Sequence, residues 1–410
     1  MTSRFRAELA RWQVALIAGL VLGLVFGLIE GYSIFSVAFA HDLRLNRGQA
    51  SSMYAAYLLT SAVAAPPAGR VVDRFGPSTV VRLAFPALAL ALGLCAVAVA
   101  SWQMYGLYLG LVAPSTTLLI MSSQVLVNNS YARDRGKALG IAYAGVGLGD
   151  FLLFSLLGAL VQHAGWRCAY LAAGLIAALG AVLFLLLSRS MTGLGQPADR
   201  PRAPGEAHDA RGMKPYRCAA FYFLWMAALT ASVLDFVVFQ HVVPYLVTEG
   251  YTESAAGLLL GLAALGYIAG QLGAGALSDR VGRESVGIVS APAFAAGLCG
   301  LWLLPSTWLV AVSIAVLGVS VGSVIGCRSA AQGDLFAGAG LGRVSGLIQV
   351  ASALGAALGT WLGGFSFDLT GSYGLTFAAA GIGAGVWAVA LWCAAPRRAR
   401  PEQASLAARR

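Results

Sequence analysis

Long apolar runs alternate with short polar segments along the whole chain of 410 residues. A helix needs about 20 mostly apolar residues to cross the hydrocarbon core of a bilayer. Twelve runs meet that length, so the pattern predicts twelve membrane-spanning helices joined by short loops. The expected ranges are 12–36, 50–69, 77–100, 102–127, 137–162, 166–188, 218–247, 254–277, 285–304, 307–330, 341–366 and 373–394.

The composition supports an all-α membrane protein. Hydrophobic residues make up 59% of the chain and charged residues only 11%, with a mean hydropathy of +0.77. Soluble domains carry about 25% charged residues. These values exclude a soluble enzyme and a disordered chain, and they make the lipid bilayer the first expected partner.

The formal net charge of +10 has a topological explanation. If the N-terminus is cytoplasmic, all but three of the 27 Lys and Arg residues lie on the inner side, the exceptions being Arg44, Arg47 and Arg167. Such an asymmetry is the positive-inside rule. We therefore expect an inner-membrane protein with both termini in the cytoplasm and no nucleic-acid partner.

The chain is expected to consist of two six-helix bundles. Residues 189–217 carry four Pro, several Gly and mixed charges without an apolar period, which is typical of a linker. The predicted domains are therefore 1–188, a cytoplasmic linker at 189–217, and 218–410.

The two predicted bundles repeat one another at an offset of 206 residues. Repeats of this kind are the construction rule of many secondary transporters, whose substrate sites lie near mid-membrane between the repeats. We therefore expect two pseudo-symmetric halves. The matched pairs include Gly69 with Gly275, Asp73 with Asp279, Arg74 with Arg280, Gly76 with Gly282, Pro86 with Pro292, Trp102 with Trp308, Gly140 with Gly346 and Gly149 with Gly355.

Two equivalent loops carry a recognisable motif. The first reads G-R-V-V-D-R-F-G from Gly69 to Gly76, and the second G-A-L-S-D-R-V-G-R from Gly275 to Arg283. Both resemble the signature loop of the major facilitator superfamily. Their carboxylates can contact helix N-termini and their cations can contact helix C-termini, so we expect them to gate the cytoplasmic side. The predicted gating residues are Asp73, Arg74, Asp279 and Arg280; the plainer alternative for the two Arg is topology alone.

Further segments narrow the resemblance. Residues 131–149 read Y-A-R-D-R-G-K-A-L-G-I-A-Y-A-G-V-G-L-G, residues 165–167 read G-W-R, and residues 367–373 read F-D-L-T-G-S-Y. These are similar to the monocarboxylate transporter family and its oxalate/formate relatives. The resemblance implies an alternating-access carrier of small organic anions, coupled to protons or exchanging anions, and we expect it to act as a monomer.

The chain departs from that family at the expected substrate site. Such carriers place a cation on helix 8, where this sequence has Tyr267 and Gln271. The cation nearest to the cavity is Arg328, about 31 Å along helix 10 from its outer end. Tyrosine hydroxyls and amides suit a partly apolar substrate. The candidate substrate-binding residues are Arg328, Gln271, Tyr267, Tyr32, Tyr105 and Gln240.

Three carboxylates fall inside predicted spans, namely Glu30, Asp150 and Asp235. A charge near the bilayer centre costs at least about 2.5–3.5 kcal/mol, so intramembrane carboxylates are functional candidates. Because burial favours the protonated form of a carboxyl group, each is a candidate proton-coupling residue. The alternatives are a wet outer vestibule for Glu30 and Asp235, and a packing role for Asp150.

The leading hypothesis is a proton-coupled secondary carrier of a small organic acid. The alternatives are a proton-driven exporter of amphipathic compounds and a sensor or scaffold built on a carrier fold. Helix 5 lacks the Gly-Pro pair of the drug antiporters, which disfavours the exporter. No nucleophile elbow, phosphate loop or metal-ligand cluster is visible, so we expect neither an enzyme nor a cofactor.

Overall fold

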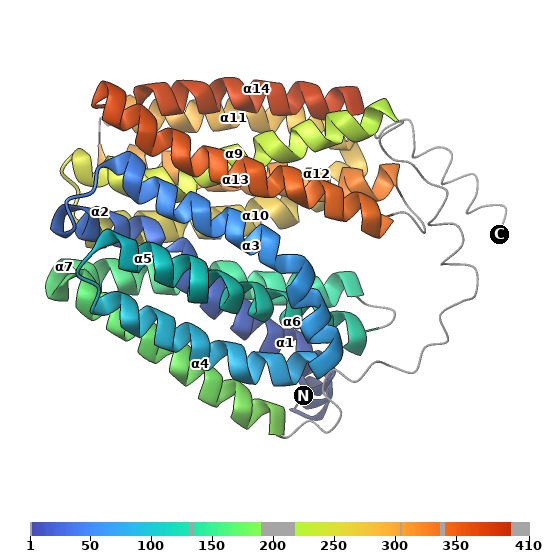
Figure 1. Cartoon of the computed structure of the whole chain (residues 1–410). Coiled ribbons are helices and arrows are strands. Elements are labelled where there is room, and N and C mark those ends of the chain that lie inside the picture. The colour runs from blue at the N-terminus through green and yellow to red at the C-terminus, as the bar shows by residue number, and fades with distance from the viewer. Residues whose placement is uncertain (1, 132–134, 190–217, 304–305, 337–340, 395–410) are drawn as a thin grey trace. The chain divides into compact units, whose positions relative to one another are not determined.

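Helices account for almost every described residue of the protein (Figure 1). The computed structural model describes residues 2–131, 135–189, 218–303, 306–336 and 341–394. The predicted linker, 189–217, therefore lies outside the described residues except for Arg189, the last residue of α7. The elements before the linker are α1 (Thr2–Glu30), α2 (Tyr32–Asp42), α3 (Arg47–Phe75), α4 (Pro77–Ala96), α5 (Ser101–Leu107), η1 (Tyr108–Val112), α6 (Ala113–Ser130) and α7 (Arg135–Arg189). Those after it are α9 (Ala219–Thr248), α10 (Glu253–Val281), α11 (Arg283–Leu303), α12 (Thr307–Leu335), α13 (Leu341–Thr370) and α14 (Gly374–Ala394).

The predicted spans coincide with these helices. Ten helical segments of the described chain are long and apolar enough to cross a membrane. One of them lies in α7, which turns at Gly165, where φ is 79° and a side chain would be strained, and so holds two predicted spans. The remaining predicted span, 50–69, lies in α3, which is not among these ten segments. The all-α, twelve-helix membrane fold is confirmed.

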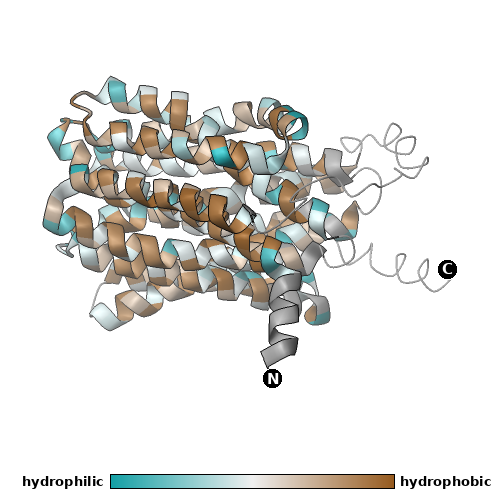
Figure 2. Cartoon of the chain, turned by 90° about the horizontal axis from the view of Figure 1, so that it is seen from below, coloured by the Kyte–Doolittle hydropathy of each residue, from teal (hydrophilic) through white to brown (hydrophobic). Residues whose placement is uncertain are grey.

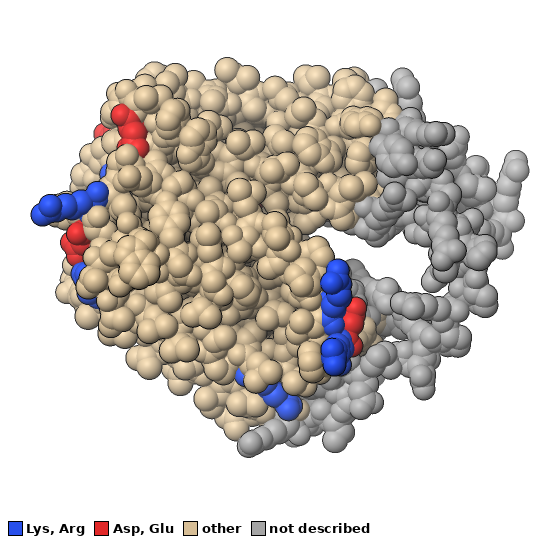
Figure 3. All heavy atoms as spheres, in the orientation of Figure 1, with Lys and Arg blue, Asp and Glu red and all other residues tan. Residues whose placement is uncertain are grey.

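The outer surface is apolar, as lipid contact requires. Large hydrophobic side chains are widely exposed, among them Trp308 at 81% and Val63 at 78%. Figure 2 shows apolar residues along the lengths of the helices, and in Figure 3 the charged side chains of the visible face gather near helix ends. In water this surface would aggregate, whereas in a bilayer it costs nothing to expose.

The described residues form two compact units. Unit 1 comprises those within Met1–Arg200 together with Val243–Gly261, and unit 2 those within Pro201–Val242 and Leu262–Arg410. The segment Val243–Gly261 belongs to unit 1 through close contacts with α7. A Cβ added at Gly257 would lie 2.6 Å from the carbonyl oxygen of Phe154, and the Ser254 amide donates to Gln162 Oε1 at 3.1 Å.

A glycine seam joins α1 to α7 within unit 1. A Cβ at Gly145 would lie 2.5 Å from the carbonyl oxygen of Gly19, and one at Gly149 would overlap the carbonyl oxygen of Gly23. Helix backbones approach this closely only where a side chain is absent. The seam therefore fixes the position of Asp150, the residue after Gly149.

Unit 2 contains the equivalent seam between α9 and α13. A Cβ at Gly355 would overlap the carbonyl oxygen of Leu229, and one at Gly359 would lie 2.7 Å from that of Val233. Gly355 and Leu229 follow Gly149 and Gly23, respectively, by the 206 residues of the sequence repeat. Positions related by the sequence repeat therefore make equivalent helix contacts within each unit.

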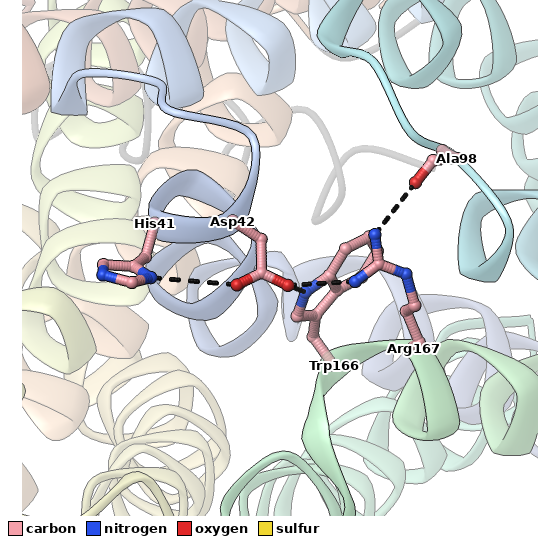
Figure 4. Close-up of polar contacts among 5 residues, drawn as sticks. All are labelled: His41, Asp42, Ala98, Trp166 and Arg167. Carbon is pink, nitrogen blue, oxygen red and sulfur yellow. Dashed lines mark hydrogen bonds and ion pairs between the residues drawn. The ribbon is translucent and has the colours of Figure 1, made fainter.

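A polar cluster ties three helix ends together in unit 1 (Figure 4). Asp42 Oδ2 accepts from Trp166 Nε1 at 2.8 Å and from Arg167 Nη1 at 2.9 Å. Arg167 Nη2 also donates to the carbonyl oxygen of Ala98 at 3.4 Å, and the guanidinium lies 4.1 Å from the Trp166 ring centroid. The ends of α2 and α4 are thereby joined to the turn at Gly165.

We expect Asp42→Ala to lower the melting temperature of the purified protein by roughly 2–4 °C. The carboxylate is half exposed, so its loss removes only about 1 kcal/mol of charge-assisted hydrogen bonding. His163→Ala is the matched control, because His163 is also exposed and close to the same turn. Equal melting temperatures for the two variants would show that the cluster contributes no stability.

Candidate substrate and proton site

Charged side chains occur within the spans of both units. Unit 2 holds Asp235 and Arg328, and unit 1 holds Glu30 and Asp150. A charge inside a span needs a partner of opposite charge or a polar neighbour, because lipid supplies neither.

Asp235 and Arg328 of unit 2 lie within electrostatic range of one another. Asp235 lies near the middle of the 30-residue helix α9 and is half-buried. Arg328 lies in the second half of α12, and its charge acts on Asp235. Tyr267 of α10 also acts electrostatically on Arg328. Asp235 of α9 and Tyr267 of α10 thus both lie within electrostatic range of Arg328 of α12.

The guanidinium of Arg328 is held on one side. Its Nη1 donates to Ser352 Oγ of α13 at 2.6 Å. Its Nε is buried and has no hydrogen-bond partner within the described part of the chain. A guanidinium offers its N–H groups in a planar fork that matches the two oxygens of a carboxylate. Besides Ser352, the guanidinium of Arg328 can therefore bind one further anionic or hydrogen-bond-accepting group.

A second glycine seam sets the height of α12 against α10. A Cβ at Gly322 would overlap the carbonyl oxygen of Tyr267, and one at Gly326 would lie 2.9 Å from that of Gln271. Gly326 precedes Arg328 by two residues. The predicted residues Tyr267 and Gln271, both half-buried, are thereby fixed on the neighbouring helix at the level of this part of α12.

The carboxylates of unit 1 share a tyrosine. Glu30, at the end of α1, and Asp150 of α7 both act electrostatically on Tyr54 of α3. Glu30 also acts on Tyr57, whose hydroxyl bonds Thr116 Oγ1 at 3.1 Å. Asp150 is buried and Glu30 is half-buried. Both predicted proton-coupling residues of this unit therefore lie within electrostatic range of Tyr54.

Of the three remaining predicted substrate residues, two donate hydrogen bonds within unit 1 and the third is buried. The hydroxyl of buried Tyr32 donates to the carbonyl oxygen of Ala50 at 2.6 Å, and that of Tyr105 donates to the carbonyl oxygen of Gln49 at 2.9 Å. Both bonds join neighbouring elements of unit 1. Gln240 is buried in α9. A substrate-binding role for these three residues stays a prediction.

The predicted gating residues lie at helix ends. Asp73 and Arg74 are exposed in the last turn of α3, where the Arg74 guanidinium lies 5.4 Å from the Phe75 ring centroid. Arg280 is exposed at the end of α10, and the side chain of Asp279 lies outside the described set. Their gating role stays a prediction.

Sequence reasoning missed the buried cation of the second loop. Arg283 is only 7% exposed, and its Nε donates to Asp334 Oδ2 at 3.0 Å while Nη1 donates to Ser278 Oγ at 2.5 Å. Ser278 and Arg283 both belong to the G-A-L-S-D-R-V-G-R motif. Within unit 2 this motif therefore fastens the start of α11 to the end of α12.

Comparison with known sequences identifies relatives along the whole chain. The sequence profile described as Major Facilitator Superfamily matches residues 14–252 and 224–410. Monocarboxylate transporter 13 of Bos taurus is 27% identical over 387 residues, which cover 90% of this chain and 86% of that protein. Monocarboxylate transporter 11 of Mus musculus is 28% identical over 346 residues, covering 80% and 75% respectively.

Solved structures share the fold. A bacterial homolog of the human lysosomal transporter Spinster, in an inward-facing and occupied conformation, superposes with a TM-score of 0.72 at 17% identity, covering 93% of this chain and 97% of that one. A D-xylose-proton symporter gives a TM-score of 0.71 at 17% identity, with coverages of 93% and 96%.

Proposed function

Because the chain belongs to the Major Facilitator Superfamily, and is thus a multi-pass membrane transporter and not an enzyme, we propose that it carries a small monocarboxylate together with a proton. The proposal depends on one observation, the environment of the Arg328 guanidinium. Arg328 is a cation within a span, and its guanidinium donates a hydrogen bond to Ser352. Its buried Nε has no hydrogen-bond partner among the described residues. The names of the relatives support a carboxylate as the ligand of that group.

Asp235 is the proposed proton carrier. While ionised it neutralises Arg328, on which it acts electrostatically. Protonation removes that counter-ion and leaves the guanidinium available for the substrate carboxylate. Proton and carboxylate then load together and cross the low-dielectric centre without added net charge. Glu30 and Asp150 are the alternative proton carriers of this proposal.

We propose that the two halves of the sequence repeat are the parts that move during transport. The halves 1–188 and 218–410 would alternate around the substrate, with the linker, both termini and the gating loops on the cytoplasmic side of an inner membrane. Asp73, Arg74, Asp279 and Arg280 would close that side. Both predicted halves belong to one chain, and the proposed transporting unit is a monomer.

The first test of the proposal is binding and uptake of a monocarboxylate panel. The panel consists of acetate, lactate, pyruvate and butyrate, and the controls are the corresponding neutral amides. We expect at least one acid to raise the melting temperature of the purified protein and to enter proteoliposomes, while its amide does neither. Failure of all four acids would overturn the carboxylate assignment.

Arg328→Gln is expected to raise the KM for the transported panel acid by roughly 30- to 150-fold. The variant removes a charge-assisted, bidentate contact of about 2–3 kcal/mol. Arg328→Lys keeps the charge without the fork and should fall in between. A KM equal to that of the wild type in Arg328→Gln would remove this residue from the site.

A second candidate function is export of cationic amphipathic compounds. The observation in its favour is the unit 1 group, in which the two carboxylates Glu30 and Asp150 act electrostatically on Tyr54. Carboxylates and aromatic rings together suit organic cations. A deletion strain challenged with a panel of cationic dyes decides between the two, because only this second function predicts hypersensitivity.

A further inference from the structure

We propose that Ser352 is the positioning residue that orients Arg328 toward the substrate carboxylate. This inference rests on the proposed function, since it concerns the same guanidinium. Ser352 lies in the first half of α13, is only 8% exposed, and was not among the residues that the sequence pattern selected. Its role follows from the direction of its two hydrogen bonds.

The hydroxyl of Ser352 can only accept from Arg328. A guanidinium has donors and no acceptor, so Nη1 donates to Ser352 Oγ at 2.6 Å. The single hydroxyl proton is directed to the carbonyl oxygen of Ile348 at 3.3 Å, one turn earlier in the same helix. Both bonds are therefore compatible, and together they fix the oxygen lone pair that receives the guanidinium.

The helix that carries Ser352 is itself rigidly placed. Gly355 and Gly359 of α13 lie against the backbone of Leu229 and Val233 in α9, with no room for a Cβ at Gly355. Ser352 precedes this seam by about one turn, and Asp235 follows Val233 by two residues. The seam therefore fixes the position of Ser352, which accepts from Arg328, relative to that of Asp235.

This arrangement leaves one part of the guanidinium for a ligand. Nη1 is occupied by Ser352, whereas Nε is buried and lacks a partner among the described residues. A long, flexible arginine side chain loses rotational freedom when it binds. Because the bond to Ser352 already restricts the Arg328 side chain before the substrate binds, less freedom is lost on binding. The Ser352 hydroxyl should therefore contribute to substrate affinity without touching the substrate.

The test is a double-mutant cycle in proteoliposomes, with the transported acid of the acetate, lactate, pyruvate and butyrate panel as probe. Ser352→Ala should raise KM roughly tenfold and leave the maximum rate within about twofold. Ser352→Thr keeps the hydroxyl and should restore KM. In the Arg328→Lys background, which lacks the fork, Ser352→Ala should change KM less than about twofold.

The outcomes separate this inference from the function on which it rests. If Arg328→Gln raises KM but Ser352→Ala does not, the role of Ser352 is overturned and the carboxylate carrier stands. If Arg328→Gln has no effect, the proposed site fails as a whole. If Ser352→Thr fails like Ser352→Ala, or the alanine effect persists undiminished in the Arg328→Lys background, Ser352 acts in packing and the inference is overturned.

Discussion

Asp235→Asn is expected to abolish proton-driven accumulation of the substrate while exchange continues. Asn has nearly the shape of the carboxyl group but cannot carry a proton. Arg328 then loses the anionic counter-ion that acts on it in the wild type, and the substrate carboxylate becomes its permanent partner. The variant should therefore bind substrate at every pH and exchange it across the membrane, yet gain nothing from a pH gradient.

The measurement uses proteoliposomes and the transported acid of the monocarboxylate panel. With an acidic exterior, the wild type should accumulate the acid above equilibrium and Asp235→Asn should not. In preloaded vesicles without a gradient, counterflow through the variant should stay within about threefold of the wild type. Its counterflow KM should also be independent of pH, whereas that of the wild type should rise as higher pH ionises Asp235 and lets it compete for Arg328.

Glu30→Gln and Asp150→Asn provide the comparison, because they make the same chemical change in unit 1. If one of them loses gradient-driven accumulation and Asp235→Asn retains it, the proton carrier lies in the group around Tyr54. Loss of both accumulation and counterflow in Asp235→Asn would instead indicate that the carboxylate is needed for substrate binding.

The membrane fold could be predicted from the sequence because the bilayer makes one demand of every span. Each crossing segment must be long, apolar and helical, and that demand is visible residue by residue. Breaks within a span were harder to predict. Gly31, between α1 and α2, and the π-helical turn Tyr108–Val112 both lie inside predicted spans, 12–36 and 102–127, whose hydropathy does not mark a break in the helix.

The charged members of the site could also be predicted, whereas their partners could not. Arg328 and Asp235 stand out because charge is rare inside a span. Ser352 is one of many serines in apolar helices, and its bond to Arg328 depends on the rotation of α13 about its axis. The same holds for Asp334, whose bond to Arg283 joins residues 51 positions apart.

The repeat preserves packing more closely than chemistry. The α1–α7 and α9–α13 seams occur at positions 206 residues apart. At the same offset, however, Arg328 corresponds to Ser122, which is fully buried in unit 1, and Asp150 corresponds to Ala356. Backbone contacts limit which residues a seam tolerates, whereas a polar site can be rebuilt by single substitutions. The two units have therefore come to carry different charged groups on the same helical frame.

The seams give the second large expected effect, in which the same Gly→Ala change destabilises the protein at one position of a helix and does not destabilise it at another. Gly355→Ala should lower the melting temperature of the purified protein by roughly 5–10 °C, because the new Cβ overlaps the carbonyl oxygen of Leu229 and overpacking costs about 1–3 kcal/mol. Gly346→Ala, also in α13, has no atom within 4 Å of its added Cβ. Since Ala is the better helix former, this control should be neutral or slightly stabilising.

The equivalent pair in unit 1 extends the test to the repeat. Gly149→Ala should destabilise the protein by a similar amount, because its Cβ overlaps the carbonyl oxygen of Gly23, and Gly140→Ala of the same helix should not, because nothing lies within 4 Å of its added Cβ. Melting temperatures in detergent, followed by the fluorescence of the native tryptophans, report all four variants. If the seam variants melt like their controls, the helices can separate at little cost and the seams do not fix the positions of Asp150 and Ser352. If only one seam variant is destabilised, the two units differ in how tightly their equivalent helices are held.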